Sequence, residues 1–193
     1  MIYLSMSDAD FQVRFDEIVQ RSETVPVGVM ETVKDIIAQV RTRGDQALLA
    51  LTNQFDRVGI CSPEGLEVSS EEIAEAHTLL SKDTIDALRH AVERVERFHR
   101  KQKQQTWLST EEADVMVGQK VTPLDRIGMY VPGGKASYPS SVIMNAVPAR
   151  VAGVREIIMV CPAPEGEINP AVLVAADLAG VDRIFKVGGA QAV

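Results

Sequence analysis

The hydrophobic pattern is most regular between residues 125 and 193, where three short apolar runs each end in a glycine- or proline-rich turn. They occupy residues 126–131, 156–161 and 182–187. Apolar runs of this length, separated by segments long enough for helices, are typical of parallel strands buried on both faces by crossover helices. The pattern therefore predicts a β-α-β-α-β layer at the start of a Rossmann-like sheet.

The first segment between these runs is expected to be helical at residues 140–152. Ser140 or Ser141 is its expected N-cap, and Gly153 is the glycine that ends it. Because Pro148 has no N–H to donate to the helix ladder, we expect a kink or break just before it. That break would divide the segment into two short helices.

The second helical segment is expected at residues 169–179, where Asn169 caps the helix, Pro170 takes its first position and Gly180 ends it. Residues 189–193 then look like the opening turn of a third helix. A parallel sheet left open at that point exposes apolar strand faces and unpaired backbone groups. We therefore expect the chain to be the N-terminal part of a longer protein, with its sheet truncated on the C-terminal side.

The first half of the chain has helical periodicity and reads as structural. Helices are expected at about residues 8–21, 27–43, 45–55, 70–80 and 82–104. Asp45 is the expected cap of the third helix, and the Ser69-x-x-Glu72 spacing is that of a capping box that opens the fourth. The first three helices read as packing elements, and Phe55 and Phe98 are expected on buried faces.

Two shorter features complete the pattern. Residues 66–68 form a possible short strand, and residues 107–123 are expected to form a β-hairpin that leads into the first parallel strand. We place a domain boundary there, with a helix-rich N-terminal region at residues 1–106 and the start of an incomplete Rossmann-like domain at residues 107–193. The expected fold class is α/β.

Composition places the chain among ordinary globular proteins, with 46% hydrophobic and 24% charged residues. A net charge of -7 and a pI near 5.0 disfavour nucleic acid and anionic membranes as partners. No apolar run approaches the roughly 20 residues of a membrane span, and the acidic start lacks the basic region of a secretory signal. We expect a cytoplasmic protein.

Cysteine and histidine positions predict no metal site in this chain. Cys61 and Cys161 lie in separate segments, which offers neither a disulfide framework nor a metal-ligand spacing. His77, His90 and His99 fall on predicted helices without an H-E-x-x-H array. A solvated or partly packed helix position is the favoured interpretation for each histidine.

The carboxyl edge of the predicted sheet is the place to look for a ligand site, because loops and helix N-termini converge there in open α/β sheets. It comprises residues 130–135, 161–164 and 188–191. Gly133 and Gly134 would let backbone approach a ligand, and helix amides would favour phosphate. The spacing is not G-x-G-x-x-G, so a simple tight turn is an equally good interpretation.

Four side chains on this edge each have a functional and an ordinary interpretation. Tyr130 could stack on or hydrogen-bond a cofactor, or could place its hydroxyl in water. Gln191 could hold a nucleotide through its amide or lie on the surface, and Lys135 could pair with phosphate or be an exposed loop lysine. Cys161 could be a thiol nucleophile, although a small buried residue is favoured because no basic partner is evident.

Several separated motifs, in order, resemble the histidinol dehydrogenase family. They are Arg-Ile-Gly-Met-Tyr-Val-Pro-Gly-Gly at 126–134, Pro-Ala-Arg-Val-Ala-Gly at 148–153, Lys-Val-Gly-Gly-Ala-Gln-Ala at 186–192, and Arg-Gly-Asp-Gln-Ala at 43–47 ahead of Phe55-Asp56. The resemblance covers nearly the whole chain but only about the first half of the family's length. That agrees with the expected truncation.

The resemblance implies a zinc-dependent homodimer of histidine biosynthesis that oxidises L-histidinol through L-histidinal to L-histidine with two NAD. The family's NAD-binding tyrosine and glutamine fall on Tyr130 and Gln191. Its zinc ligands, its glutamate-histidine acid/base pair and most substrate contacts lie C-terminal to this region. The resemblance therefore implies no catalytic residue and no metal ligand within this chain, and residues 107–193 become the start of an NAD-binding domain.

Three hypotheses follow from the sequence. The first is the N-terminal part of histidinol dehydrogenase, inactive without its remainder. The second is a paralogue of the family that oxidises another small alcohol, which the substrate-binding half would distinguish. The third is a non-catalytic binding module derived from the family.

Overall fold

The computed structural model describes residues 3–20, 28–133 and 137–193, so Gly134 and Lys135 lie outside the described residues. Its α-helices are α1 (Phe11–Gln20), α2 (Val29–Arg43), α3 (Asp45–Asp56), α4 (Ser70–Leu79), α5 (Lys82–Arg100), α6 (Pro139–Ala152) and α7 (Pro170–Ala179). Its strands are β1 (Trp107–Ser109), β2 (Val117–Gln119), β3 (Arg126–Tyr130), β4 (Glu156–Val160) and β5 (Arg183–Phe185). Three short 3-10 turns are η1 (Pro63–Leu66), η2 (Pro164–Gly166) and η3 (Ala190–Ala192).

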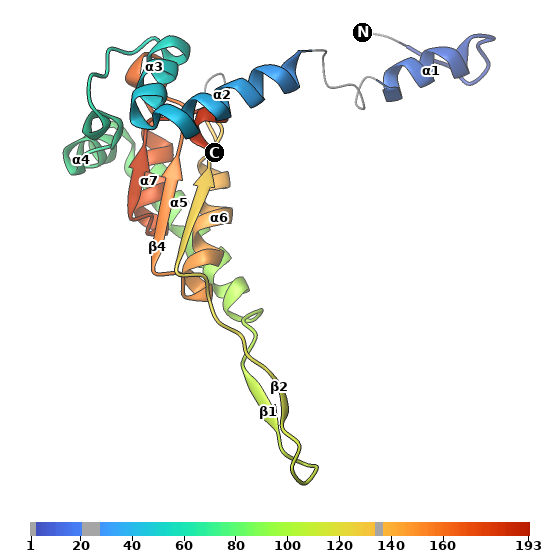
Figure 1. The fold of residues 1–193 in the computed structure, drawn as a ribbon, viewed down its shortest axis with the longest axis vertical. Helices are drawn as coiled ribbons and strands as arrows, with labels where there is room; N and C mark the ends of the chain where they lie inside the picture. The colour runs from blue at the N-terminus through green and yellow to red at the C-terminus, as the bar shows by residue number, and fades with distance from the viewer. Residues whose placement is uncertain (1–2, 21–27, 134–136) are drawn as a thin grey trace.

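Strands β3, β4 and β5 form one parallel sheet in the order of the sequence. Arg126 pairs with Glu156 at one end of β3, and Ile158 pairs with Arg183 at the start of β5. Helices α6 and α7 make the two crossovers (Figure 1). This arrangement confirms the predicted α/β class and the predicted β-α-β-α-β layer.

Only one face of this sheet is covered by the described residues, which corrects the expectation that both faces are buried. In Figure 1 helices α5, α6 and α7 lie behind the strands, and the near face carries no helix. Met129, Ile157 and Ile184 point to the covered face and are buried, whereas Arg126 and Tyr130 alternate with them and are exposed. The polar positions at every second residue of β3 already indicated one open face.

The core lies between the sheet and its helices. Helix α5 packs across α6 and α7, and α4 packs on α7. The partly buried Ile85, Leu88, Val92 and Val95 of α5 contact this core. Phe98 departs from the expected stripe, because its side chain is 60% exposed. The proposed boundary at residue 106 stays a prediction, and core packing extends across it.

Helix α6 is one continuous element, so the expected break at Pro148 is wrong. The N–H that proline lacks would have bonded the carbonyl of Met144, whose side chain is on the open side of the helix. Buried Ala146 and Val147 hold the helix against the core beside the proline. The N-cap is Tyr138 rather than Ser140 or Ser141, because Pro139 takes the first helical position.

The caps of other helices are mostly as predicted. Gly153 and Gly180 end α6 and α7 in left-handed conformation, and the Asn169 side chain accepts a bond from the Ala171 N–H. The capping box between Ser69 and Glu72 is present in full. Asp45, however, is the first residue of α3 and makes no cap, because Gly44 occupies the N-cap position.

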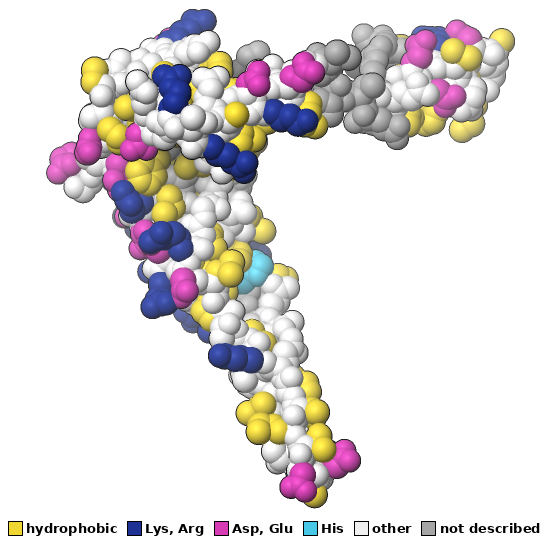
Figure 2. Space-filling model, viewed as in Figure 1, with side chains coloured by type: hydrophobic (Ala, Val, Ile, Leu, Met, Phe, Trp, Pro, Cys, Tyr) yellow, Lys and Arg dark blue, Asp and Glu magenta, His cyan; other side chains and the backbone are white. Residues whose placement is uncertain are grey.

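Two elements extend away from the core. Helix α1 buries no residue among those described, which corrects its interpretation as a packing element; Phe11 and Phe15 stack on each other with ring centroids 5.6 Å apart. The predicted hairpin is confirmed as antiparallel β1 and β2, and it projects from the body (Figure 1). Figure 2 shows apolar side chains along this hairpin and acidic side chains at its tip.

The predicted short strand at residues 66–68 is observed as a bridge that covers the outer edge of β5. The Val68 N–H donates to the Ile184 carbonyl, and the Lys186 N–H donates to the Leu66 carbonyl. The early segment therefore pairs with β5 on the side away from β4. In the described part of the chain, no helix combines the length and apolar character needed to cross a membrane.

Candidate functional site

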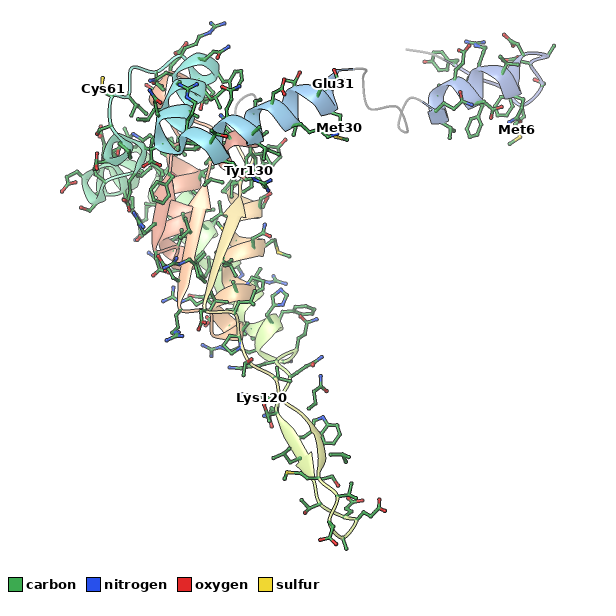
Figure 3. All side chains as sticks on the ribbon, viewed as in Figure 1. Met6, Met30, Glu31, Cys61, Lys120 and Tyr130 are labelled. Atoms are coloured by element: carbon green, nitrogen blue, oxygen red, sulfur yellow. The ribbon has the colours of Figure 1, made fainter. Side chains whose placement is uncertain are left out.

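The carboxyl ends of the three parallel strands meet at one rim, beneath α2 (Figure 1). Tyr130, the last residue of β3, lies there (Figure 3). Its hydroxyl accepts a hydrogen bond of 3.1 Å from the backbone N–H of Gly189, just beyond β5. This bond links the end of β3 directly to the loop after β5. The Tyr130 hydroxyl is therefore not simply directed into water.

Pro162, in the loop after β4, separates the two glycine-containing loops. A Cβ on Gly133 would lie 2.5 Å from the Pro162 carbonyl oxygen, and a Cβ on Gly188 would lie 2.4 Å from the proline ring. Both positions therefore exclude side chains because of close packing against Pro162. This contact explains Gly133 without a ligand, whereas Gly134 lies outside the described residues.

Gln191 is buried, so the surface interpretation of this residue is wrong. It belongs to η3 and is only 6% exposed. Its Oε1 atom is buried and has no hydrogen-bond partner among the described residues. Since buried acceptors without partners are rare in folded proteins, this atom fits a position reserved for a donor outside the described residues.

Cys161 is the small buried residue that the sequence favoured. Its side chain is 2% exposed, and its thiol approaches the Pro162 carbonyl oxygen at 3.6 Å. Burial raises the pKa of the thiol to about 11, and the charge of Asp56 acts in the same direction. At neutral pH the thiol therefore remains protonated and is a poor nucleophile.

Helix α3 brings two polar residues to this rim that the sequence reasoning missed. Thr52 is fully buried and Asp56 is 9% exposed, and both have a side-chain oxygen without a partner among the described residues. Burial raises the pKa of the Asp56 carboxyl, and interaction with the Ala163 N–H opposes that effect. Their i, i+4 spacing is visible in the sequence, but the apolar stripe predicted for this helix runs through Phe55, whose side chain is 49% exposed.

A cleft of about 440 Å³ opens beside the rim, between the loops after β3 and β4 and the start of α7. Its lining includes Gly133, Ser137, Cys161, Pro162 and Asn169. Asn169 is also the N-cap of α7, so the start of that helix borders the cleft. The cleft is large enough for part of a small-molecule ligand.

Histidines in the described residues take ordinary roles. His77 on α4 bonds Asp177 on α7 at 2.9 Å, which ties two helices together. In the ranges that the structure describes, no three His, Cys, Asp or Glu side chains gather as a metal site would require. The expectation that zinc ligands lie elsewhere in the protein stays a prediction.

Comparison with known proteins gives one consistent result. A model of the family described as histidinol dehydrogenase matches residues 19–193. The chain is 60% identical over 193 residues to histidinol dehydrogenase of Geobacter sulfurreducens, covering 100% of this chain and 45% of that protein. For the Geobacter metallireducens enzyme the identity is 58%, covering 100% of this chain and 44% of the relative.

A solved structure agrees with the sequence comparison. The crystal structure of histidinol dehydrogenase from Elizabethkingia anophelis superposes with a TM-score of 0.80 at 33% identity, covering 88% of this chain and 39% of that one. The chain thus spans less than half the length of these relatives. It belongs to the histidinol dehydrogenase family.

Proposed function

We propose that this chain supplies one wall of the NAD site in a histidinol dehydrogenase, which oxidises L-histidinol through L-histidinal to L-histidine. Family membership supports the reaction class. The observation that carries the proposal is the bond between the Tyr130 hydroxyl and the Gly189 N–H, two residues before Gln191. The two side chains that the resemblance assigns to NAD thus belong to loops in contact.

The polar atoms at this rim fit a dinucleotide. The Tyr130 hydroxyl accepts the Gly189 N–H and keeps its own proton to donate, for example to a ribose or amide oxygen. Gln191 Oε1 has no partner among the described residues and can accept from a ribose hydroxyl or an amide N–H. One donor and one acceptor on adjoining loops would fix the orientation of a bound nucleotide.

The chemistry divides between the cofactor and the protein. When bound, NAD accepts the hydride that leaves the alcohol carbon. Tyr130 and Gln191 bind and orient the nucleotide, while the thiol of Cys161 stays protonated and takes no part. The described residues do not form a set that fits zinc, so we derive no step through the metal.

We also expect the family's homodimer and a cytoplasmic location, with neither nucleic acid nor membrane as partner. The projecting hairpin supports a dimer, because Trp107, Leu108, Met116 and Val117 are all more than half exposed. Apolar groups gathered on an extension are typical of an interface. The net charge of -7 supports the absence of nucleic acid and anionic membrane partners.

Titration of NAD against the natural protein that contains this chain tests the cofactor site. Tyr130→Ala and Gln191→Ala should each raise the NAD dissociation constant by about tenfold, the effect of one lost hydrogen bond. Bound zinc should stay unchanged in both variants. Gln119→Ala, on the distant hairpin, is the control and should bind NAD like the parent. Unchanged affinity in both site variants would contradict the proposal.

A further inference from the structure

Helix α3 ends against the two turns that complete the candidate cofactor site. It packs on η2, in the loop after β4, and on η3, which carries Gln191. Thr52 and Asp56 occupy the last turns of α3 and are both buried. An i, i+4 spacing places them on one side of the helix.

Asp56 links α3 to the loop after β4. The Ala163 N–H interacts with its carboxylate, and its charge acts on the Cys161 thiol two residues earlier. Ala163 is 1% exposed, so its N–H has no access to bulk water. A buried N–H that loses its acceptor destabilises the folded loop, so the Asp56 carboxylate helps to fix the position of this loop.

Three buried oxygens lack partners among the described residues, and all three belong to this junction. They are Oγ1 of Thr52, Oδ2 of Asp56 and Oε1 of Gln191. A cluster of incompletely bonded polar atoms weakens the folded state, and natural proteins retain such clusters mainly at functional sites. The cluster joins α3 to a residue already assigned to the cofactor.

We propose that Asp56, with Thr52 beside it, is a positioning residue that holds the 161–163 loop and the turn carrying Gln191 in the geometry needed for the cofactor. This inference rests on the proposed NAD site. Asp56 acts through the Ala163 N–H and through the packing of α3 on η3, and it does not itself touch the nucleotide. The interaction of Asp56 with the Ala163 N–H also explains why a carboxylate is retained in a buried position.

A neighbouring residue offers a matched control. The Asn53 amide donates to the Ile60 carbonyl at 2.8 Å and accepts from the Ile60 N–H at 2.9 Å, which fixes the segment after α3. Asn53→Ala should therefore weaken the end of α3 while leaving the contact between Asp56 and the Ala163 N–H in place. The NAD affinity of the Asn53→Ala protein therefore shows the effect of destabilising α3 without changing the Asp56 contact.

The test compares NAD affinity in variants of the natural protein. Asp56→Ala should raise the NAD dissociation constant about fivefold to tenfold, whereas Asp56→Asn keeps an acceptor oxygen and should stay within about twofold of the parent. Asn53→Ala should lower the melting temperature without changing affinity. An Asp56→Ala protein that binds NAD like the parent, or an Asp56→Asn protein as weak as Asp56→Ala, would overturn the inference.

Hydrogen exchange gives a readout that does not depend on the reaction. The peptide containing Ala163 should exchange faster in Asp56→Ala than in Asp56→Asn or Asn53→Ala, and equal exchange in all three would overturn the inference. If Asp56→Ala does not fold, Asp56→Leu replaces it, because leucine keeps a side chain of similar size but offers no acceptor oxygen. An Asp56→Leu protein that binds NAD like the parent would overturn the inference.

A double-mutant cycle separates the two proposals. The effects of Asp56→Ala and Gln191→Ala on NAD affinity should be less than additive, because both act through the same turn. If Gln191→Ala weakens binding and Asp56→Ala does not, the positioning role fails and the NAD site stands. If neither Gln191→Ala nor Tyr130→Ala changes affinity, the NAD site itself fails.

Discussion

Gly189 has a backbone conformation that other residues rarely adopt, with φ 64° and ψ -167°. A Cβ added there would also lie 2.5 Å from Gln191 Oε1. Gly189→Ala should therefore lower the free energy of unfolding by about 1–3 kcal/mol, as measured by urea denaturation. Gly59→Ala is the control, because its Cβ would meet open space. Equal effects of the two substitutions would contradict the strain argument.

Burial of Asp56 gives the protein a defined pH dependence. Its pKa is raised in the folded state, chiefly by burial, so folding favours the protonated carboxyl. The free energy of unfolding should fall as pH rises from the unfolded pKa of about 3.9 through the raised folded value. Asp56→Asn should remove this component, so its stability relative to the parent should increase over that range and then level off.

Urea unfolding at a series of pH values measures this difference. Asp45→Asn, at the exposed start of the same helix, is the matched control. A difference between Asp56→Asn and the parent that is constant from about pH 3.5 to 7 would contradict the assigned pKa direction.

The position of a single residue in the fold was predictable from sequence where the local pattern determines it. Tyr130 is the last residue of β3 and Gln191 follows β5, and the carboxyl end of a strand lies at a known edge of a parallel sheet. Asp56 and Thr52 could not be found in this way, because helical periodicity shows which residues share a side but not which partner covers it. Their burial depends on turns more than 100 positions later in the chain.

At the scale of elements, Glu72 connects the start of α4 to the residue that follows β5. One carboxylate oxygen accepts the Ser69 N–H at 3.0 Å, and the other pairs with the ammonium of Lys186, which follows β5. Glu72→Gln should keep the capping box but lose the ion pair, whereas Glu72→Ala should lose both. We expect the alanine variant to cost about 1 kcal/mol more than the glutamine variant, measured by chemical denaturation. Equal losses would mean that the cap contributes little.

Element boundaries followed the capping chemistry closely, and the departures have physical causes. Asn169, Gly153 and Gly180 act locally, so their sequence signals were sufficient. Pro148 did not break α6, because packing on the core overrides the loss of one backbone bond. Treating the strands as buried on both faces failed because length and apolar character were weighed above the alternating polar positions of β3.

At the scale of the whole molecule, the hairpin of β1 and β2 is the feature that most needs a partner. If it supports the proposed dimer, Trp107→Lys should shift the natural protein toward monomer in light scattering at low concentration, because it places charge in an apolar interface. Leu79→Lys, at a 64% exposed position on α4, is the control and should leave the mass unchanged. Identical mass distributions would exclude the hairpin from the interface.

The global arrangement was predictable as far as strand direction and order. Alternating strands and helices leave few choices once connections are short and crossovers right-handed. The projection of the hairpin was not predictable, because it depends on what surrounds the chain, whereas the open sheet face was indicated by the alternating polar positions of β3. The sequence predicted residues 66–68 only as a possible strand and did not indicate that they pair with β5.

The in-order sheet also bears on how the protein is made. Because β3, β4 and β5 adjoin in the order in which a ribosome releases them, β4 and β5 can each dock on a neighbour that has already emerged. The outer edge of β5 then closes on the Leu66 and Val68 backbone, which was synthesised long before. Nascent chains should therefore gain protease resistance stepwise, and the gain from closing the β5 edge should come only after Lys186 leaves the exit tunnel.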